Sequence, residues 1–339
     1  MKRLVLIDGH AILHRAYHAF PLTLKTRRGE TINAVYGFTR MLLTVLKDLK
    51  PDYVAVAFDL AEPTFRHELF IGYQAHRPER EVELEDQLKR VEEVVRFLNI
   101  PTFAVKGFEA DDVIGTLAKQ ATKRGVETIV VTGDRDIMQL VNDKVKVYVP
   151  VKGFADAKLF VKKNVQELLG VRPEQIIDYK AMVGDASDNY PGIPGIGPKT
   201  AVALLGKYKD LDTIYKNLRL SSENLVSRSA YKNLRLSSEN LVSRSARNNS
   251  IDRIKPSVAK KLIEGKESAR LSRKLARIVT DVPIKLNLKA CQVHDYDRGK
   301  AIALFQRLEF RSLIKKLPRS ESEEERPKAE DKNKQMKLL

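Results

Sequence analysis

The segment from Glu127 to Asp134, "ETIVVTGD", joins a short run of β-branched residues to an acidic residue that follows closely behind it. Runs of Thr, Ile and Val of this length are typical of buried strands. Two other apolar runs end in the same way, because Asp8 follows "LVLI" and Asp59 follows "VAVAF". One acid after a strand is ordinary turn chemistry, whereas three after equivalent strands indicate that they meet at one edge.

Helical patterns separate these strands along the chain. Residues 31–50, "TINAVYGFTRMLLTVLKDLK", and residues 82–100, "VELEDQLKRVEEVVRFLNI", carry apolar side chains at helical spacing, and residues 145–151, "VKVYVPV", read as a further strand. Strands that alternate with helices predict an α/β fold with a mostly parallel sheet covered on both faces. Ligands bind such sheets just beyond the carboxyl ends of the strands, so we expect the three acids to line one crevice.

The second half of the chain is mainly helical, through "VQELLG", "EQIIDYKAMVGD" and "KTAVALLGKY". We therefore expect an α/β domain over residues 1–160 and a smaller helical lobe over 161–317. A 16-residue segment, "YKNLRLSSENLVSRSA", occurs twice without change in residues 215–246, and two identical copies are too few for a solenoid. We interpret it as a basic insertion, and the charged segment 318–339 as a disordered tail.

The charge balance favours a polyanionic partner. The chain has 61 Lys and Arg against 44 Asp and Glu, a formal net charge of +17, and clustered cations gain affinity by releasing counterions from phosphates. No apolar run approaches the ~20 residues that cross a bilayer, and Asp8 and His10 come too early for a signal peptide. We expect a cytoplasmic protein without a membrane partner. The single cysteine, Cys291, cannot form an internal disulfide, and we expect it to be structural.

Further acids are concentrated in three short motifs. Taken alone, "EADD" fits the first turn of a helix, and "GDRD" and "GDASDN" fit turns. Together, carboxylates gathered at one edge would repel one another unless cations bridge them. Because no His or Cys cluster accompanies them, an all-oxygen site favours Mg²⁺ or Mn²⁺, and two such ions roughly 4 Å apart can hydrolyse a phosphodiester. The candidate metal ligands are Asp8, Asp59, Glu109, Asp111, Asp112, Asp134, Asp136, Asp185 and Asp188.

The ordered motifs "LIDGHAILHRAYHAF", "FDLAEPTFRHELFIGYQAHRP", "FEADDVIG", "TGDRDIMQLV" and "GDASDNYPGIPGIGPKTA" resemble the 5′ nuclease domain of bacterial DNA polymerase I, within the flap endonuclease family. The resemblance runs from Arg3 to about Leu317 and is interrupted mainly by the duplicated segment. It implies a PIN/flap-endonuclease-like fold, with a helical arch at about 62–100 and a helix-hairpin-helix motif at about 184–205. It also implies a structure-specific 5′ nuclease that uses two metal ions.

The resemblance assigns roles to individual acids. It implies that Asp8, Asp59 and Asp111 bind the first metal, with Glu109 acting through water. The second metal is expected on Asp134, Asp136 and Asp188, and Asp112 and Asp185 are expected to support these ligands. The catalytic set that it implies is Asp8, Asp59, Asp111, Arg66 and Arg77.

It also implies contacts with DNA. Arg15 would face the scissile phosphate, while Arg66, Tyr73 and Arg77 would meet a 5′ strand threaded under the arch. At Gln74 the chain departs from the family's "YKxxR", which removes a positive charge, and we expect reduced activity.

The glycine-rich segment "GIPGIGPKT" lacks P-loop spacing, because Pro198 separates Gly197 from Lys199. A hairpin of this kind lets backbone amides approach a duplex phosphate. The resemblance implies that it grips DNA together with a monovalent cation such as K⁺. The expected contacts are Gly192, Gly195, Gly197, Lys199 and Thr200.

The expected substrates are branched or nicked duplex DNA with a 5′ flap, and RNA primers in RNA–DNA hybrids. Family analogy suggests a monomer. The final "QMKLL" resembles a sliding-clamp-binding peptide through Gln335, Leu338 and Leu339, although a frayed apolar terminus reads the same way. Two alternatives stay open: a PIN-type ribonuclease, which should lack the glycine hairpin and arch, and a nonenzymatic DNA-structure binder, which should lack the metal acids. The preference between exonuclease and flap cleavage is also open.

Overall fold

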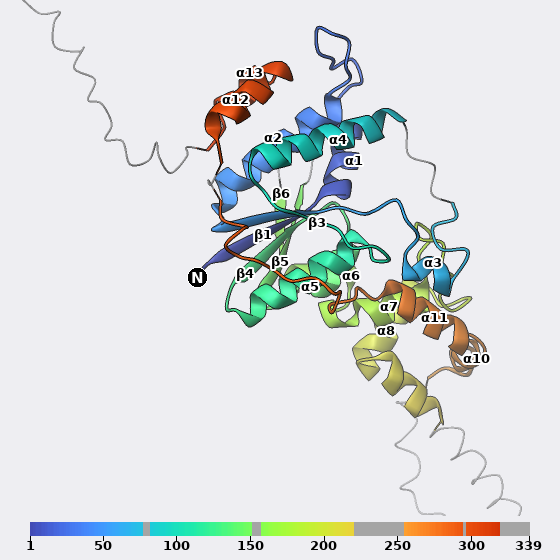
Figure 1. Cartoon of the computed structure of the whole chain (residues 1–339). Coiled ribbons are helices and arrows are strands. Elements are labelled where there is room, and N and C mark those ends of the chain that lie inside the picture. Colours follow the sequence, from blue (N-terminus) through green and yellow to red (C-terminus); the bar gives the residue numbers. More distant parts are fainter. Residues whose placement is uncertain (77–81, 151–156, 220–253, 294–295, 319–339) are drawn as a thin grey trace, which may run out of the picture.

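The computed structural model describes residues 1–76, 82–150, 157–219, 254–293 and 296–318. Its centre is a six-stranded sheet in the order β3-β2-β1-β4-β5-β6, with helices on both faces (Figure 1). The strands are β1 (Arg3–Asp8), β2 (Tyr53–Ala57), β3 (Thr102–Phe103), β4 (Glu127–Val131), β5 (Val145–Pro150) and β6 (Ala157–Phe160).

The first five strands are parallel, and β6 pairs with β5 in the antiparallel sense. Because β1 lies between β2 and β4, the connection from β1 leads to β2 on one side, and the connection from β4 leads to β5 on the other. This arrangement creates a switch point between the carboxyl ends of β1 and β4, the usual ligand crevice of open α/β sheets. The predicted α/β fold with a mostly parallel sheet is confirmed.

Successive side chains of each strand point to opposite faces, so the sheet supports two cores. Val5 and Ile7 pack on one side with α1 (Gly9–Ala19), α2 (Asn33–Leu49), α4 (Val82–Phe97) and α12 (Arg298–Arg307). Leu4 and Leu6 pack on the other side with α5 (Ala110–Lys123). The apolar stripes of α2, α4 and α5 are what the sequence periodicity predicts, and they hold the strand ends in fixed positions.

The helical lobe extends from the edge of the sheet where the strands end (Figure 1). In it α11 packs against α7 and against the short α3, so a segment between β2 and β3 contacts the lobe directly. The lobe elements are α6 (Lys162–Leu169), η3 (Pro173–Gln175), α7 (Ile176–Val183), α8 (Pro198–Tyr208), α10 (Pro256–Glu264) and α11 (Lys266–Ala276). The remaining short elements are α3 (Phe65–Leu69), η1 (Asp136–Leu140) and α13 (Arg311–Ile314).

The segment predicted as the arch contains helix α4. From Leu84 onward α4 is a core helix that packs against α2, and the Gln87 side chain accepts from the amide of Ala34 at 2.8 Å and donates to Asn33 at 2.9 Å. The arch predicted at about 62–100 therefore includes α4, and residues 77–81 within it lie outside the described residues. The helical periodicity that revealed α4 does not say which partner its apolar face packs on.

Several expectations fall on residues that the structure does not describe. Residues 211–219 are helical, but 220–246 of the duplicated segment and 319–339 of the tail lie outside the described residues. Strands β3 and β6 were not predicted, because one has only two residues and the other is mostly exposed. In the described part of the chain, no helix is long and apolar enough to span a membrane. Cys291 is buried, and burial raises the pKa of its thiol to about 11, as suits a packing residue.

Candidate metal centre

Asp8 and Asp134 meet across the switch point of the sheet. Asp8 is the last residue of β1, and its carboxylate accepts from the Ala11 amide at 3.0 Å, which caps α1. Its other oxygen accepts from the Thr132 hydroxyl at 2.7 Å, and that hydroxyl accepts from the Asp134 amide at 2.9 Å. Thr132 therefore fixes both acids, a role that sequence reasoning missed although the residue lies between "IVV" and Asp134.

Asp59 is held against the start of α5. Its carboxylate accepts from the Ala110 amide at 2.7 Å, and its own amide donates to Nδ1 of His10 at 3.0 Å. Because Asp111 is in the first turn of α5, this contact brings the acids that follow β2 and precede α5 to one place. The amino end of helix α5 carries a partial positive charge from the helix dipole, which favours anions there.

Burial and mutual repulsion raise the pKa values of three of the acids here. Burial raises the pKa of Asp8 to about 7, and Asp59 and Asp134 add repulsion. Burial also raises the pKa of Glu109 to about 7 and holds that of Asp111 well above its usual value, with Asp134 and Asp8 adding to the latter. Carboxylates that resist ionisation in one another's presence gain most from a bound cation. The residues present therefore fit a divalent metal.

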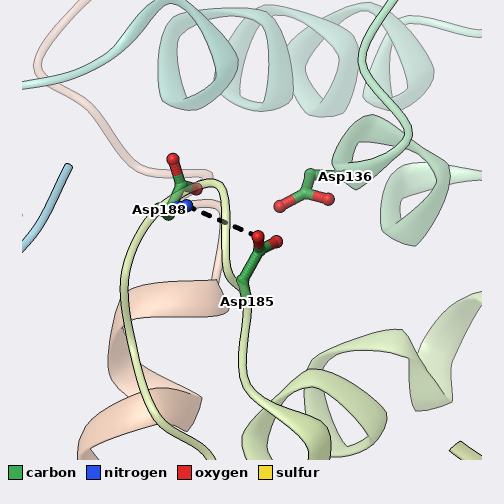
Figure 2. Close-up of side chains that lie close together, drawn as sticks. All are labelled: Asp136, Asp185 and Asp188. Carbon is green, nitrogen blue, oxygen red and sulfur yellow. Dashed lines mark hydrogen bonds between the residues drawn. The ribbon is translucent and has the colours of Figure 1, made fainter. Parts of the chain in front are cut away.

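A second group of three acids comes from two separate places in the chain. Asp136 begins η1, while Asp185 and Asp188 lie in the loop after α7, and Figure 2 shows the three carboxylates facing a common space. Their ligand oxygens lie within 4.8 Å of one another, the only such group among the described residues. Asp185 accepts from the amides of Ser187 at 2.8 Å and Asp188 at 3.4 Å, which shapes the loop. The expectation for this site named Asp134 as a ligand and Asp185 as its support, whereas the structure groups Asp185 with the other two.

Lys180 on α7 contacts both Asp136 and Asp185. Burial disfavours its charge, but the two carboxylates hold the pKa of Lys180 above its usual range. Burial raises the pKa of Asp136 to about 6 in spite of that lysine. Lys180 thus neutralises part of the charge of the group. Sequence reasoning missed it, although "DYKAMVGD" places it five residues before Asp185.

Asp112 and Arg66 form a buried ion pair, so Arg66 is not exposed to a DNA strand as expected, whereas Asp112 supports its neighbours. The Arg66 guanidinium donates to both oxygens of Asp112, at 2.7 and 2.9 Å, and also to the carbonyls of Leu275 and Arg277. Asp112 is 0% exposed and Arg66 2%, so neither can reach a metal or a strand of DNA without rearrangement. Asp112 also accepts from the Glu109 amide, so the helix-capping interpretation of "EADD" describes this residue correctly.

The residues after α3 connect the two groups of acids. Tyr73 is only 3% exposed, so it is not available as a stacking surface, contrary to expectation. Its hydroxyl lies 3.3 Å from Oε2 of Glu109 and 3.5 Å from Oδ2 of Asp188. Gln74 donates through its side chain to Asp188 at 3.2 Å. Arg77 lies outside the described residues, and the aliphatic stem of Arg15 lies beside Gly133, 4.0 Å from where a Cβ would be.

The glycine hairpin connects α7 to α8 and divides into two halves. Gly192 is buried with a φ of +63°, and a Cβ there would lie 2.2 Å from the backbone nitrogen of Gly184. Its amide donates to the Ser272 hydroxyl at 3.1 Å. Gly192 therefore packs within the lobe and does not present its amide to DNA, contrary to expectation. Gly197, the N-cap of α8, is exposed and has no atom within 4 Å of a Cβ.

The other predicted hairpin contacts are placed as follows. Gly195 is exposed with a φ of +76°, and its carbonyl accepts from Lys261 at 3.0 Å. Lys199 is exposed in the first turn of α8, and Thr200 is half-buried next to it. The accessible part of the hairpin is therefore Gly195 to Thr200.

Comparisons with known proteins agree with this architecture. Residues 3–170 match the family model of the 5′-3′ exonuclease N-terminal resolvase-like domain, and residues 171–299 match that of the 5′-3′ exonuclease C-terminal SAM fold. DNA polymerase I of Chloroflexus aurantiacus is 42% identical over 322 residues, covering 93% of this chain and 31% of the relative. The chain spans about a third of the length of the curated relatives it matches.

Two solved structures share the fold at low identity. T5 5′-exonuclease with bound zinc ions has a TM-score of 0.61 at 20% identity, covering 81% of this chain and 89% of the other. The catalytic core of Rad2 in complex with DNA has a TM-score of 0.55 at 15% identity, covering 93% and 92%. The acids at the switch point, the resolvase-like sheet and the SAM-like lobe thus occur together in one chain, which belongs to the 5′-3′ exonuclease family.

Proposed function

We propose that this chain is a divalent-metal-dependent 5′ nuclease that hydrolyses phosphodiesters at branched or nicked DNA with a 5′ flap. The observation that carries the proposal is the meeting of carboxylates from β1, β2, α5, β4 and the loop after α7 at one edge of the sheet. Two bound Mg²⁺ or Mn²⁺ ions would supply an activated water and neutralise the phosphate during in-line displacement.

Each acid has a part that its position supports. Asp8, Asp59 and Asp111 would hold one ion, and Glu109 would position a water beside it. Asp136, Asp185 and Asp188 would hold the other, with Asp134 between the two groups because it raises the pKa of both Asp111 and Asp136. Lys180 would keep the second group partly neutral. Arg66 and Asp112 would hold α3 against α5, so that Glu109 stays in position.

The grip on DNA is proposed to come from the exposed half of the hairpin. Gly197 lets a phosphate approach the amino end of α8, where the helix dipole favours an anion, and Lys199 adds a charge. A K⁺ ion at the hairpin carbonyls would be part of this contact. Solved structures that share the fold include DNA complexes of Rad2 and of the bacteriophage T5 D15 flap endonuclease, which supports a DNA substrate here.

Four further features are proposed: RNA substrates, a protein partner, the monomeric state and the cytoplasmic location. RNA primers in a hybrid would meet the same phosphate contacts. The sliding clamp would be reached through Gln335, Leu338 and Leu339, which lie outside the described residues. Monomeric behaviour follows from family analogy. A chromosomal DNA substrate would place the protein in the cytoplasm.

The test compares three substrates labelled at the 5′ end: a flap, a nicked duplex and single-stranded RNA, each in Mg²⁺. Asp134→Ala removes an acid between the two groups. Asp143→Asn is the matched control, because its side chain is 88% exposed and pairs only with Lys162 among the described residues. We expect cleavage of the flap by the wild type and the control, and its loss in Asp134→Ala and in EDTA.

Other outcomes would reject the proposal. Cleavage of RNA alone would favour a PIN-type ribonuclease. Binding of the flap without cleavage by the wild type in either Mg²⁺ or Mn²⁺ would favour a nonenzymatic DNA-structure binder. Equal loss in both variants would mean that net charge, and not the metal centre, was being measured.

A further inference from the structure

An open cleft of about 820 Å³ lies between α3 and α11, outside the metal centre. Arg270 and Lys274 on α11, with Arg277 just after it, point into the cleft because they are spaced three and four residues apart on one face. Lys274 and Arg277 are exposed, and neither has an ion pair with a described residue. Arg270 pairs with the exposed Glu267 at 2.8 Å. The cleft therefore keeps a net positive charge.

The floor of the cleft is apolar. Phe65 is half-buried, Leu69 is 44% exposed, and Leu271 lies between the basic residues on the same face of α11. Exposed apolar side chains beside unpaired cations suit a ligand that has both anionic and flat apolar parts. A single strand of nucleic acid has both, since its phosphates pair with guanidinium groups and its unpaired bases stack on aromatic rings. A duplex would present its phosphates only.

The cleft adjoins the metal centre through one turn of α3. Phe65 lines the cleft, whereas the next residue, Arg66, reaches Glu109 at 3.1 Å and Asp112. Arg66 also donates to the carbonyls of Leu275 and Arg277 at the end of α11. The two walls of the cleft are thus the same segments that brace the acids.

We propose that this cleft binds the single-stranded 5′ segment of the nucleic acid whose junction lies at the metal centre. The inference rests on the proposed function and adds a site to it. Phosphates contact Lys274 and Arg277, and a base stacks on Phe65. A purely structural role for the cations is the alternative, because basic side chains at the end of α11 also stabilise its dipole.

The experiment measures the Kd of nicked duplexes that carry 5′ flaps of three lengths, none, five or fifteen nucleotides, in Ca²⁺ over a range of salt. The test variant is Lys274→Ala/Arg277→Ala. The control is Lys163→Ala/Lys300→Ala, which removes the same charge from side chains that are 84% and 73% exposed elsewhere. A second variant, Phe65→Leu, keeps the apolar volume and removes the ring. Thermal midpoints are recorded for all.

We expect the test variant to lose roughly fivefold to tenfold in affinity for the longest flap and nothing for the flapless nick. The slope of log Kd against log salt should fall by about 1.4, for two single-strand phosphate contacts. Phe65→Leu should weaken flap binding without changing that slope. Equal losses with and without a flap, or a lowered thermal midpoint with unchanged binding, would overturn the inference. Cleavage of the flapless nick in Mg²⁺ tests the proposed function separately.

Discussion

At the scale of single residues, Arg66 shows how burial decides a role. An arginine beside an acidic centre is expected to meet phosphates, yet here its donors are directed to Asp112, Glu109 and two backbone carbonyls. Although burial disfavours the charge, hydrogen bonding to Asp112 holds the pKa of Arg66 above its usual range. A buried pair of this kind stabilises little relative to an apolar pair, but loss of one partner strands the other.

Arg66→Met should therefore destabilise the protein by about 3–5 kcal/mol, because the Asp112 carboxylate is left charged and buried. Urea unfolding in EDTA measures this without catalysis. The double variant Arg66→Met/Asp112→Leu should recover part of the loss, since the fully buried carboxylate is then gone. The recovery is incomplete because Glu109 still lacks its arginine and the Val279 amide lacks its acceptor. If the Arg66→Met protein is stable but binds DNA weakly, Arg66 contacts the DNA strand, as its sequence motif predicts.

Gln74 is the second residue whose neighbours change the expectation. It holds Asp188 through its side chain and donates through its amide to the Asp188 carbonyl. Gln74→Lys should raise the single-turnover rate of flap cleavage at saturating Mg²⁺, because an ammonium stabilises developing negative charge. It should also raise the Mg²⁺ concentration for half-maximal rate, because the ammonium lies beside Asp188.

The matched control is Gln74→Met, which removes the hydrogen bond without adding charge. It should lower the rate and leave the charge of the centre unchanged. The lysine argument is wrong if Gln74→Lys does not cleave faster than the wild type at any Mg²⁺ concentration.

At the scale of elements, the hairpin between α7 and α8 separates a packing glycine from an accessible one. Gly192→Ala should destabilise by about 3 kcal/mol, because a left-handed backbone and a clash with the Gly184 backbone both oppose a Cβ. Gly197→Ala should cost less than about 1 kcal/mol, because it has negative φ and open space.

The effects of the two variants on duplex binding should have the opposite order to their effects on stability, provided that both proteins are folded when the Kd is measured. Gly197→Ala places a methyl group where a phosphate would approach, so its Kd for flapless duplex should rise while its thermal midpoint stays close to that of the wild type. Gly192→Ala, measured below its unfolding transition, should bind nearly as the wild type. The reverse result would mean that Gly192 contacts DNA after all.

At the scale of the whole molecule, the acids link stability, pH and metal. Asp8 and Glu109 have pKa values of about 7 in the fold, above the ordinary values of 3.8 and 4.5. Since the native state binds more protons than the unfolded chain between these values, stability of the metal-free protein should fall as pH rises from about 4.5 through 7. A divalent cation competes with those protons for the carboxylates. The stabilisation that it gives should therefore increase as pH rises.

We therefore expect Mg²⁺ to stabilise the protein more at pH 8 than at pH 6, by about 2.7 kcal/mol, since each of the two carboxylates with a pKa near 7 adds about tenfold in apparent affinity. Thermal unfolding in EDTA and in excess Mg²⁺ at both pH values measures it. Asp8→Asn should raise the metal-free midpoint at pH 8 and reduce the gain from Mg²⁺. A gain that does not depend on pH would disprove the linkage.

The sequence determined the alternation of the longer strands with helices, the mostly parallel sheet and the acids that follow its strands, but not β3, β6 or the order of strands in the sheet. These properties depend on local patterns, because strand runs, helical periodicity and an acid behind a strand are all read within about 20 residues. The acids that follow β1, β2 and β4 were found in this way, and so was α4 as a helix.

Only the tertiary structure decided which of these residues are accessible. Arg66 is capped by a carbonyl 209 residues further along the chain, and Lys180 meets an acid 44 residues before it. The same long-range packing buried Asp112, Tyr73 and Gly192. A local pattern specifies what a residue can do, but burial and distant partners decide whether it meets the substrate, because desolvation and pairing depend on groups that only the fold brings together.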